Sequence, residues 1–230
     1  MIADRLAEVR ARIDAAARSA GRNPSSVKLI AVSKTVPLDR ILEAHAAGQR
    51  DFGENRVQEA LQKIQASTDF LISWHLIGHL QTNKARRAGT AFATIQSIDS
   101  VELLQKVDAA AAEAGSRPEL LIQVDVAGEA SKFGAAPADV PRIFDAAGSL
   151  KAASVVGLMT IPPPADRPQD ARPWFQRVRE LRDRWVQSGV PASMLRELSM
   201  GMSGDFEVAI QEGATMVRVG TAIFGSRHVQ

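Results

Sequence analysis

Lys34 is the residue of this sequence whose type and position best suit covalent chemistry. It ends LIAVSK, an apolar run with the β-branched composition of a buried strand. A lysine is almost never fully buried without a partner. One interpretation is a strand-end lysine whose amine reaches water. The other is an amine whose pKa is lowered by burial and by a neighbouring cation, so that it attacks an aldehyde. The residue types alone leave both open.

Two glycine-containing segments are suited to bind a phosphate group. Ser203 and Gly204 precede the helical pattern DFEVAIQEG, and Gly220 and Thr221 precede a last short helical pattern. The start of a helix presents free N–H groups, and small residues let the backbone approach an anion closely. Either segment alone is a common turn, but the two together favour a phosphate-bearing ligand.

Arg218 is a charged residue within an apolar run. It alternates with Val217 and Val219, which suit a layer of helices, so Arg218 is expected to point to the opposite face of the strand. A buried guanidinium needs a partner, because an unpaired buried charge is very costly. That partner is either an anionic or lone-pair-bearing ligand, or a salt bridge to Glu54 or Asp125.

His75 and His79 stand four residues apart, the spacing of a metal pair on a helix. Here they fall on an expected strand and its exit loop, where their side chains do not converge, and no third ligand is evident. We therefore predict no metal site, and we expect His75 to line a pocket or to form a hydrogen bond. The sequence has no cysteine, which excludes disulfides, thiolate metal sites and cysteine nucleophiles.

The elements that position these residues alternate between short apolar runs and longer helical patterns. Residues 2–20 are expected to form an amphipathic helix that ends at Gly21. The apolar runs predict eight strands, with helical patterns between them, at 27–34, 51–55, 73–80, 92–99, 119–128, 154–161, 196–203 and 216–225, the last residues already turning helical.

This alternation predicts parallel strands joined by crossover helices. Eight such units in 230 residues indicate a single (β/α)8 TIM barrel, and an open doubly wound sheet is the alternative. We find no linker, so we predict one domain, 1–230, with the helix of residues 1–21 packed on the barrel. The working face should lie at the carboxyl ends of the strands, where Lys34, Ser203 and Thr221 fall.

The composition of the chain limits the kinds of partner that it is expected to bind. The formal net charge is +2, and the arginines around residues 174–186 are interleaved with Glu180 and Asp183, so we expect no nucleic acid. No stretch approaches the ~18 apolar residues of a membrane span, and the first residues lack the apolar core of a signal peptide. We expect a cytoplasmic protein without a membrane partner.

Seven segments between residues 28 and 225 resemble those of a known family, in its order and at its spacing. They are KLIAVSKTVP, DFGENRVQE, WHLIGHLQTNK, IQSID, GLMTI, LSMGMSGDFEVAI and MVRVGTAIFG. The chain resembles the pyridoxal 5′-phosphate (PLP) homeostasis family (YggS/PROSC), small barrels related to the alanine racemase N-terminal domain. The resemblance implies a PLP fold of type III and PLP as the cofactor.

The resemblance also implies roles for individual residues. Lys34 would form the Schiff base with PLP, and Ser203, Gly220 and Thr221 would hold its phosphate. The residues that would line the ring pocket are Asn55, His75, Met159, Ser199 and Arg218.

Three positions depart from the pattern of the family. His79 stands where the family usually has proline, Arg56 where it often has tyrosine, and Gly204 where it usually has an acidic residue. Gly204 removes a negative side chain beside the expected phosphate, which should not harm anion binding. His79 and Arg56 leave the details of the barrel mouth open.

The resemblance implies a carrier or buffer of PLP rather than an enzyme. Racemases of this fold use the Schiff-base lysine and a tyrosine as their two bases, and this sequence has no tyrosine. The alternative is a weak PLP-dependent amino-acid racemase that uses His75 or solvent as the second base. A phosphate-sugar isomerase or aldolase, with Lys34 bound to a sugar, is a third candidate. Apo forms of PLP-dependent enzymes are possible partners, and the resemblance allows a monomer or a homodimer.

Overall fold

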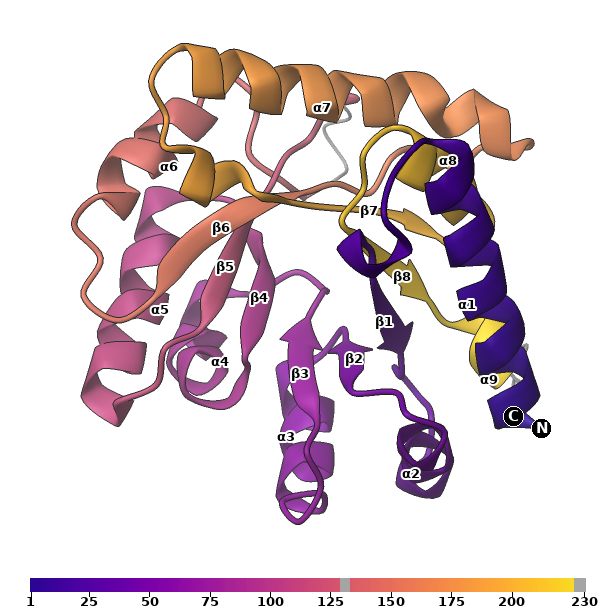
Figure 1. The fold of residues 1–230 in the computed structure, drawn as a ribbon. Coiled ribbons are helices and arrows are strands. Elements are labelled where there is room, and N and C mark those ends of the chain that lie inside the picture. The colour runs from indigo at the N-terminus through magenta and orange to yellow at the C-terminus, as the bar shows by residue number, and fades with distance from the viewer. Residues whose placement is uncertain (129–132, 226–230) are drawn as a thin grey trace.

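The strands close into a parallel barrel. The computed structural model describes residues 1–128 and 133–225. Each strand pairs in parallel with the next, and the last pairs with the first. Figure 1 shows the strands with the helices outside them. The strands are β1 Lys28–Val32, β2 Asp51–Glu54, β3 Ser73–Leu76, β4 Thr94–Ile98, β5 Glu119–Gln123, β6 Ser154–Met159, β7 Glu197–Met202 and β8 Met216–Val219. The prediction of a (β/α)8 barrel is confirmed, and the open-sheet alternative is wrong.

Helices follow the strands along the chain and surround them. The helices of the described residues are α1 Ile2–Ser19, α2 Leu38–Ala46, α3 Val57–Gln65, α4 Ala85–Ala91, α5 Val101–Ala114, α6 Val140–Ala147, α7 Arg172–Gln187, α8 Phe206–Gln211 and α9 Thr221–Phe224. Short 3-10 helices lie at η1 Pro24–Ser26, η2 Thr82–Lys84, η3 Pro168–Ala171 and η4 Ala192–Leu195. No helix in the part of the chain that the structure describes has the length and apolar character of a membrane span.

The strands are shorter than the apolar runs that predicted them. The run 73–80 is a strand only to Leu76, and the run 216–225 is a strand only to Val219, after which Thr221–Phe224 is helical as expected. Residues beyond the strand ends, such as Leu80 and Ile223, remain buried although they no longer pair in the sheet. An apolar run in the sequence indicates which residues are buried, and the buried residues continue beyond the point where the strand stops pairing.

The first helix packs on the outside of the barrel. Apolar residues recur at helical spacing in α1, and Leu6, Val9 and Ile13 are buried on one face. The helix ends where Gly21 adopts a positive φ of 68° and Arg22 donates its N–H to the carbonyl of Ala17. The buried face of α1 contacts α8, α9 and α2, so this helix covers the junction between the end and the beginning of the barrel.

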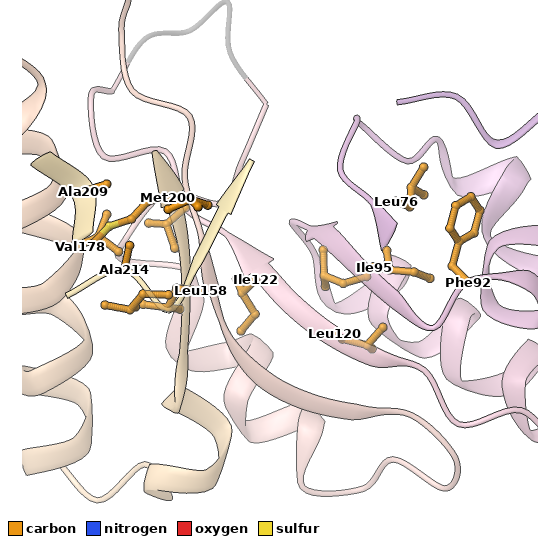
Figure 2. Close-up of a cluster of buried hydrophobic side chains, with 14 of the residues drawn as sticks. Leu76, Phe92, Ile95, Leu120, Ile122, Leu158, Val178, Met200, Ala209 and Ala214 are labelled. Atoms are coloured by element: carbon orange, nitrogen blue, oxygen red, sulfur yellow. The ribbon is translucent and has the colours of Figure 1, made fainter. Parts of the chain in front are cut away.

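Two groups of apolar residues form the core. The larger lies between the strands and the helices; Figure 2 shows Leu120, Ile122 and Leu158 from the strands, with Val178 of α7 and Ala209 of α8. The smaller is formed by Ile30, Leu121, Val156, Met159 and Met216, whose side chains face the barrel interior. Burying a large aliphatic side chain contributes roughly 1.5–3 kcal/mol, so the outer group supplies most of the driving force for folding.

An irregularity in strand pairing turns Met159 inward. Leu120 pairs with Val155, but Leu121 pairs with Gly157, so β6 carries one extra residue at this point. The extra residue lets both Val156 and Met159 reach the interior group. Gly157 is needed there, because a Cβ atom would lie 2.0 Å from the carbonyl oxygen of Glu197.

A buried carboxylate of α5 fixes the start of β6. Asp108 accepts hydrogen bonds from the backbone N–H groups of Lys151, Ala152 and Ala153. Burial alone would raise the pKa of Asp108, but these three N–H donors outweigh it and lower the pKa. The folded state therefore favours the ionised carboxylate.

We expect Asp108→Ala to lower the free energy of unfolding by roughly 1–3 kcal/mol at neutral pH, because buried N–H donors lose their acceptor. A carboxyl whose pKa is lowered on folding stabilises the protein above its unfolded pKa, and this stabilisation is lost as the pH falls. Urea unfolding of both proteins should show the difference shrinking in acid. A difference that stays constant through the acid range would contradict this account of Asp108.

Candidate functional site

The loops that follow β1, β7 and β8 meet at the carboxyl end of the barrel. Ala31 of β1 pairs with Val219 of β8 in parallel, so the chain passes on to Lys34 and to Thr221 at the same end. Gly220 lies against β1, where a Cβ atom would be 3.3 Å from the carbonyl oxygen of Val32. The sequence-predicted residues Lys34, Gly220 and Thr221 therefore lie at the same rim of the barrel.

Ser203 joins the loop after β7 to the loop after β8. Its hydroxyl accepts a hydrogen bond from the N–H of Gly220 at 3.2 Å. Asp205, two residues after Ser203, accepts the N–H of Met202 at 2.6 Å, which closes the turn into α8. Burial is the main reason that the pKa of Asp205 is raised. The two segments expected to bind phosphate thus lie side by side.

The turn that carries Lys34 has an unusual backbone. Thr35 adopts a φ of 62°, a left-handed conformation that a β-branched residue rarely takes. Its N–H donates to Oε1 of Glu59 at 2.7 Å, and the N–H of Val36 donates to the carbonyl of Ser33 at 2.9 Å. Such conformations cost about 1–3 kcal/mol and persist only where surrounding contacts hold them. The backbone next to Lys34 is therefore held by α3.

An ion cluster of Lys63, Glu54 and Glu59 lies beneath this turn and stabilises its backbone. Lys63 of α3 donates to Oε1 of Glu54 at 2.8 Å, to Oε1 of Glu59 at 3.0 Å and to the carbonyl of Ser33 at 2.9 Å. Ser33 donates its hydroxyl to the same oxygen of Glu54 at 2.6 Å. One ammonium group thus joins the ends of β1 and β2 to α3.

The pKa values of the two carboxylates of this cluster shift in opposite directions. It raises the pKa of Glu54 despite the hydrogen bonds from Lys63 and Ser33. Burial also acts to raise the pKa of Glu59, but the N–H of Thr35 and the ammonium of Lys63 outweigh it, so that pKa is lowered. Glu54 is fully buried, and within the described residues its Oε2 atom has no hydrogen-bond partner. Lys63 and Ser33 therefore offset only part of the effect of burial on the pKa of Glu54.

Asn55, at the end of β2, packs against the loop after β3. A Cβ atom on Gly78 would lie 2.2 Å from the carbonyl oxygen of Asn55 and 2.7 Å from its Cα atom. Both of these are backbone atoms, which cannot rotate away as a side chain can. The glycine therefore sets the position of Asn55 at the rim.

Gly78→Ala should lower the free energy of unfolding by about 1–3 kcal/mol, because the added methyl group forces the backbone at Asn55 to shift. Gly204→Ala is the matched control, since a Cβ atom at Gly204 has no neighbour within 4 Å. Chemical denaturation compares the two. Equal stability of the two variants would show that the close contact between Asn55 and Gly78 does not exclude a Cβ atom at position 78.

Arg218 lies inside the barrel, as its alternation with the valines predicts. Val217 and Val219 belong to the outer apolar group, and Arg218 is only 3% exposed. Its guanidinium donates to Oγ of Ser199 at 2.7 Å and to the carbonyl of Thr160 at 2.8 Å. Both acceptors are neutral.

The salt bridge considered for Arg218 is not formed. Glu54 pairs with Lys63 on the other side of its strand, and Asp125 accepts the N–H groups of Ala127 and Gly128. Among residues 1–128 and 133–225, Arg218 has no carboxylate within ion-pair distance. Burial lowers the pKa of Arg218 to about 10, although the charge of Asp205 opposes this. The guanidinium stays charged at neutral pH and can attract a lone pair or an anion.

The remaining ring-pocket candidates lie deeper than the rim. Met159, His75 and Ser199 are each at most 1% exposed. Ser199 contacts Arg218 directly, whereas His75 hydrogen-bonds Asp51 at the start of β2. The structure therefore connects His75 to the site through other side chains.

The positions that depart from the family pattern have identifiable surroundings. The ring of His79 stacks on Phe133, with centroids 3.7 Å apart, and its Nδ1 lies 3.7 Å from Oδ2 of Asp99. Arg56 precedes α3 as an exposed residue, and Gly204 is open on its Cβ side. Within the described residues, no group of three or more histidine, aspartate or glutamate side chains could hold a metal ion.

Sequence reasoning did not select several residues that build the site. The sequence pattern indicates only that Lys63 and Glu59 lie on a helix and that Asp51 and Gln96 lie on strands. Charged or amide residues within short buried strands are a usable signal, since such groups need partners. Which residue is the partner of each such group can be known only from the tertiary structure.

The comparisons with known proteins cover nearly the whole chain. Residues 5–228 match the family model described as alanine racemase, N-terminal domain. The "Pyridoxal phosphate homeostasis protein" of Pseudomonas aeruginosa is 45% identical over 98% of this chain and 96% of its own length. The protein of that name from Aquifex aeolicus is 44% identical over 97% of both chains.

A solved structure agrees with these sequence comparisons. PipY of Synechococcus elongatus with PLP bound has a TM-score of 0.86 and 42% identity, and the match covers 98% of this chain and all of PipY. Identity at this level over both full lengths shows the family as well as the fold. This chain therefore belongs to the pyridoxal phosphate homeostasis family, within the wider group described as alanine racemase N-terminal domain.

Proposed function

We propose that this chain binds PLP at the carboxyl end of its barrel, as a Schiff base on Lys34, and serves as an intracellular carrier or buffer of the cofactor. The observation that carries the proposal is the meeting of three loops: β1 passes Gly220 at Val32 and leads on to Lys34, and the N–H of Gly220 donates to Ser203. A lysine amine and two small-residue loops at one rim suit an aldehyde and a phosphate on the same molecule.

The residues present fit PLP. When bound, PLP supplies an aldehyde that a lysine amine can attack reversibly, together with an electron-withdrawing ring. Arg218, charged and held by neutral acceptors, is the group that would face the ring nitrogen as a donor. Ser203, Gly220 and Thr221 would hold the phosphate. Asn55, Met159 and Ser199 would border the ring, with His75 behind them.

The same residues favour binding over turnover. A guanidinium beside the ring nitrogen disfavours its protonation, which weakens the ring as an electron sink. The sequence has no tyrosine to act as a second base. His75 is poorly placed for that task, because it is fully buried and both of its ring nitrogens have partners. Release of PLP to a free amine needs no second base.

Spectroscopy and an amino-acid assay test the proposal together. Purified protein should acquire the visible absorption band of a protonated Schiff base when PLP is added, and lose it to an excess of a competing amine. The loaded protein, incubated with L-alanine, should form no more D-alanine than free PLP does. Absence of the band would overturn the binding proposal, and D-alanine formed at ordinary enzymatic rates would establish the racemase alternative.

A further inference from the structure

A continuous series of polar side chains crosses the interior of the barrel below Arg218. Arg218 donates to Oγ of Ser199 at 2.7 Å, and the hydroxyl of Ser199 donates to Oε1 of Gln96 at 2.7 Å. Nε2 of Gln96 lies 3.3 Å from Nδ1 of His75, and Nε2 of His75 lies 2.9 Å from Oδ1 of Asp51. The series runs from β8 through β7, β4 and β3 to β2.

The two ends of the series fix the direction of every hydrogen bond in it. A guanidinium only donates, and an ionised carboxylate only accepts. Burial acts to raise the pKa of Asp51, but the hydrogen bond from His75 and the charges of His75 and Lys28 outweigh it and lower that pKa. The ionised Asp51 is therefore an acceptor, and in a singly protonated His75 the proton must lie on Nε2.

The position of that proton then determines the next two groups. With Nε2 protonated, Nδ1 of His75 is an acceptor, so the amide of Gln96 presents its N–H2 to His75. This N–H2 also lies 3.8 Å from the sulfur of Met216, another acceptor. The carbonyl oxygen of Gln96 consequently faces Ser199 and takes its single hydroxyl proton. Ser199 is left with lone pairs toward Arg218.

The opposite arrangement would weaken the support of Arg218. If the amide of Gln96 were reversed, its N–H2 would donate to Ser199, and the hydroxyl proton of Ser199 would need another acceptor. Reversal would also require a proton on Nδ1 of His75, which then leaves Nε2 without one or charges the ring. Neutral buried groups in a series strengthen one another when all point in one direction.

We propose that Asp51, His75 and Gln96 are positioning residues that hold Ser199 as an acceptor and thereby fix the guanidinium of Arg218 at the PLP site. The inference rests on the proposed function for its consequence, but the direction of the hydrogen bonds can be measured without PLP. Asp51 acts from the amino end of the barrel, where it lines a cleft of about 330 Å³ together with Lys28 and Asp14. The rim is thus supported from the opposite end of the molecule.

The first test is the tautomer of His75 in the full-length protein without PLP. Nitrogen-15 NMR of the imidazole rings distinguishes a protonated Nε2 from a protonated Nδ1. We expect the Nε2-protonated neutral form in the unmodified protein. A ring with a proton on Nδ1, alone or together with one on Nε2, would overturn the proposal, whether or not the protein binds PLP.

Variants then test the transmission to the PLP site. Asp51→Asn replaces the obligate acceptor with a group that can also donate, and Gln96→Leu interrupts the series. Asp14→Asn is the matched control, because Asp14 lines the same cleft without contacting His75. We expect Asp51→Asn to alter the tautomer, and both series variants to weaken PLP binding on the order of tenfold, the effect of one lost buried hydrogen bond. Asp14→Asn should change neither quantity.

The outcomes separate this inference from the proposed function. If the unmodified protein forms no Schiff base, the proposed function fails, while the His75 spectrum still reports on the series. If the unmodified protein binds PLP but Asp51→Asn leaves the tautomer and the affinity unchanged, the positioning role is wrong. Weaker binding with an unchanged tautomer would likewise overturn it, because the effect would not pass through His75.

Discussion

Lys34→Ala should abolish the Schiff-base absorption band of the PLP-loaded protein and the covalent label left by borohydride. Lys34 follows the strand that lies beside Gly220, whereas the amine of Lys63 is held by Glu54 beneath the turn. Only a primary amine at the rim can form the Schiff base, so removing it should eliminate the label rather than reduce it. Residual, non-covalent binding through the phosphate should persist at lower affinity.

Peptide mapping after borohydride reduction makes this prediction specific. In the unmodified protein, the labelled peptide should contain Lys34. Lys84→Ala is the control, since Lys84 lies in η2 after β3, and it should retain the full band. A label on another lysine, or a band of full intensity in Lys34→Ala, would show that the site has been assigned to the wrong amine.

Lys63→Met should be among the most destabilising single substitutions in the chain. The side chain of Lys63 is 11% exposed and that of Glu54 is fully buried, so the substitution leaves a carboxylate without its cation. Breaking a buried pair by removing one partner costs about 3–5 kcal/mol. The free energy of unfolding, measured in urea at neutral pH, should fall by that order.

Two further variants isolate the cause. Glu54→Gln combined with Lys63→Met should recover part of the loss, because a neutral amide is less costly to bury than a charge. Lys106→Met removes an exposed ion pair with Glu102 and should cost less than about 1 kcal/mol. If Lys63→Met cost no more than Lys106→Met, the cluster would not be a support for the Lys34 turn.

The loss in Lys63→Met should also depend on pH. Burial already raises the pKa of Glu54, and removal of Lys63 should raise it further. A carboxyl with a raised pKa in the folded state destabilises the protein as the pH rises above the unfolded value, and protonation in acid relieves that cost. The difference between the variant and the unmodified protein should therefore be smaller in mild acid than at neutral pH.

Local patterns were sufficient for the fold and for the inward orientation of Arg218. Strand and helix periodicities depend on neighbouring residues, so the alternation of elements predicted the barrel, and the alternation around Arg218 predicted that it points inward. The ends of the strands were less accurate. Ser33 and Leu80 are buried, as their apolar runs indicate, but burial does not distinguish a strand from the loop that follows it.

The salt bridge considered for Arg218 illustrates why partners were harder to predict. Glu54 and Arg218 both occur near the ends of strands, yet Glu54 faces α3 and Arg218 faces the interior. The pairing of carboxylates with cations depends on strand register and on the face of the strand to which each side chain points. A shift of one residue in the register moves a side chain to the opposite face. The extra residue in β6, which turns Met159 inward, has no counterpart in the sequence pattern.

By itself, the sequence determined that this chain forms a strand and helix alternation with a lysine, an arginine and two glycine loops at strand ends. Only the tertiary structure decided that Lys63 pairs with Glu54 beneath the Lys34 turn, and that a series of hydrogen bonds joins Asp51 to Arg218 across the barrel. The physical reason is that the first set depends on interactions between near neighbours in the chain, whereas the second requires closure of the barrel, which brings residues from distant strands within hydrogen-bond distance.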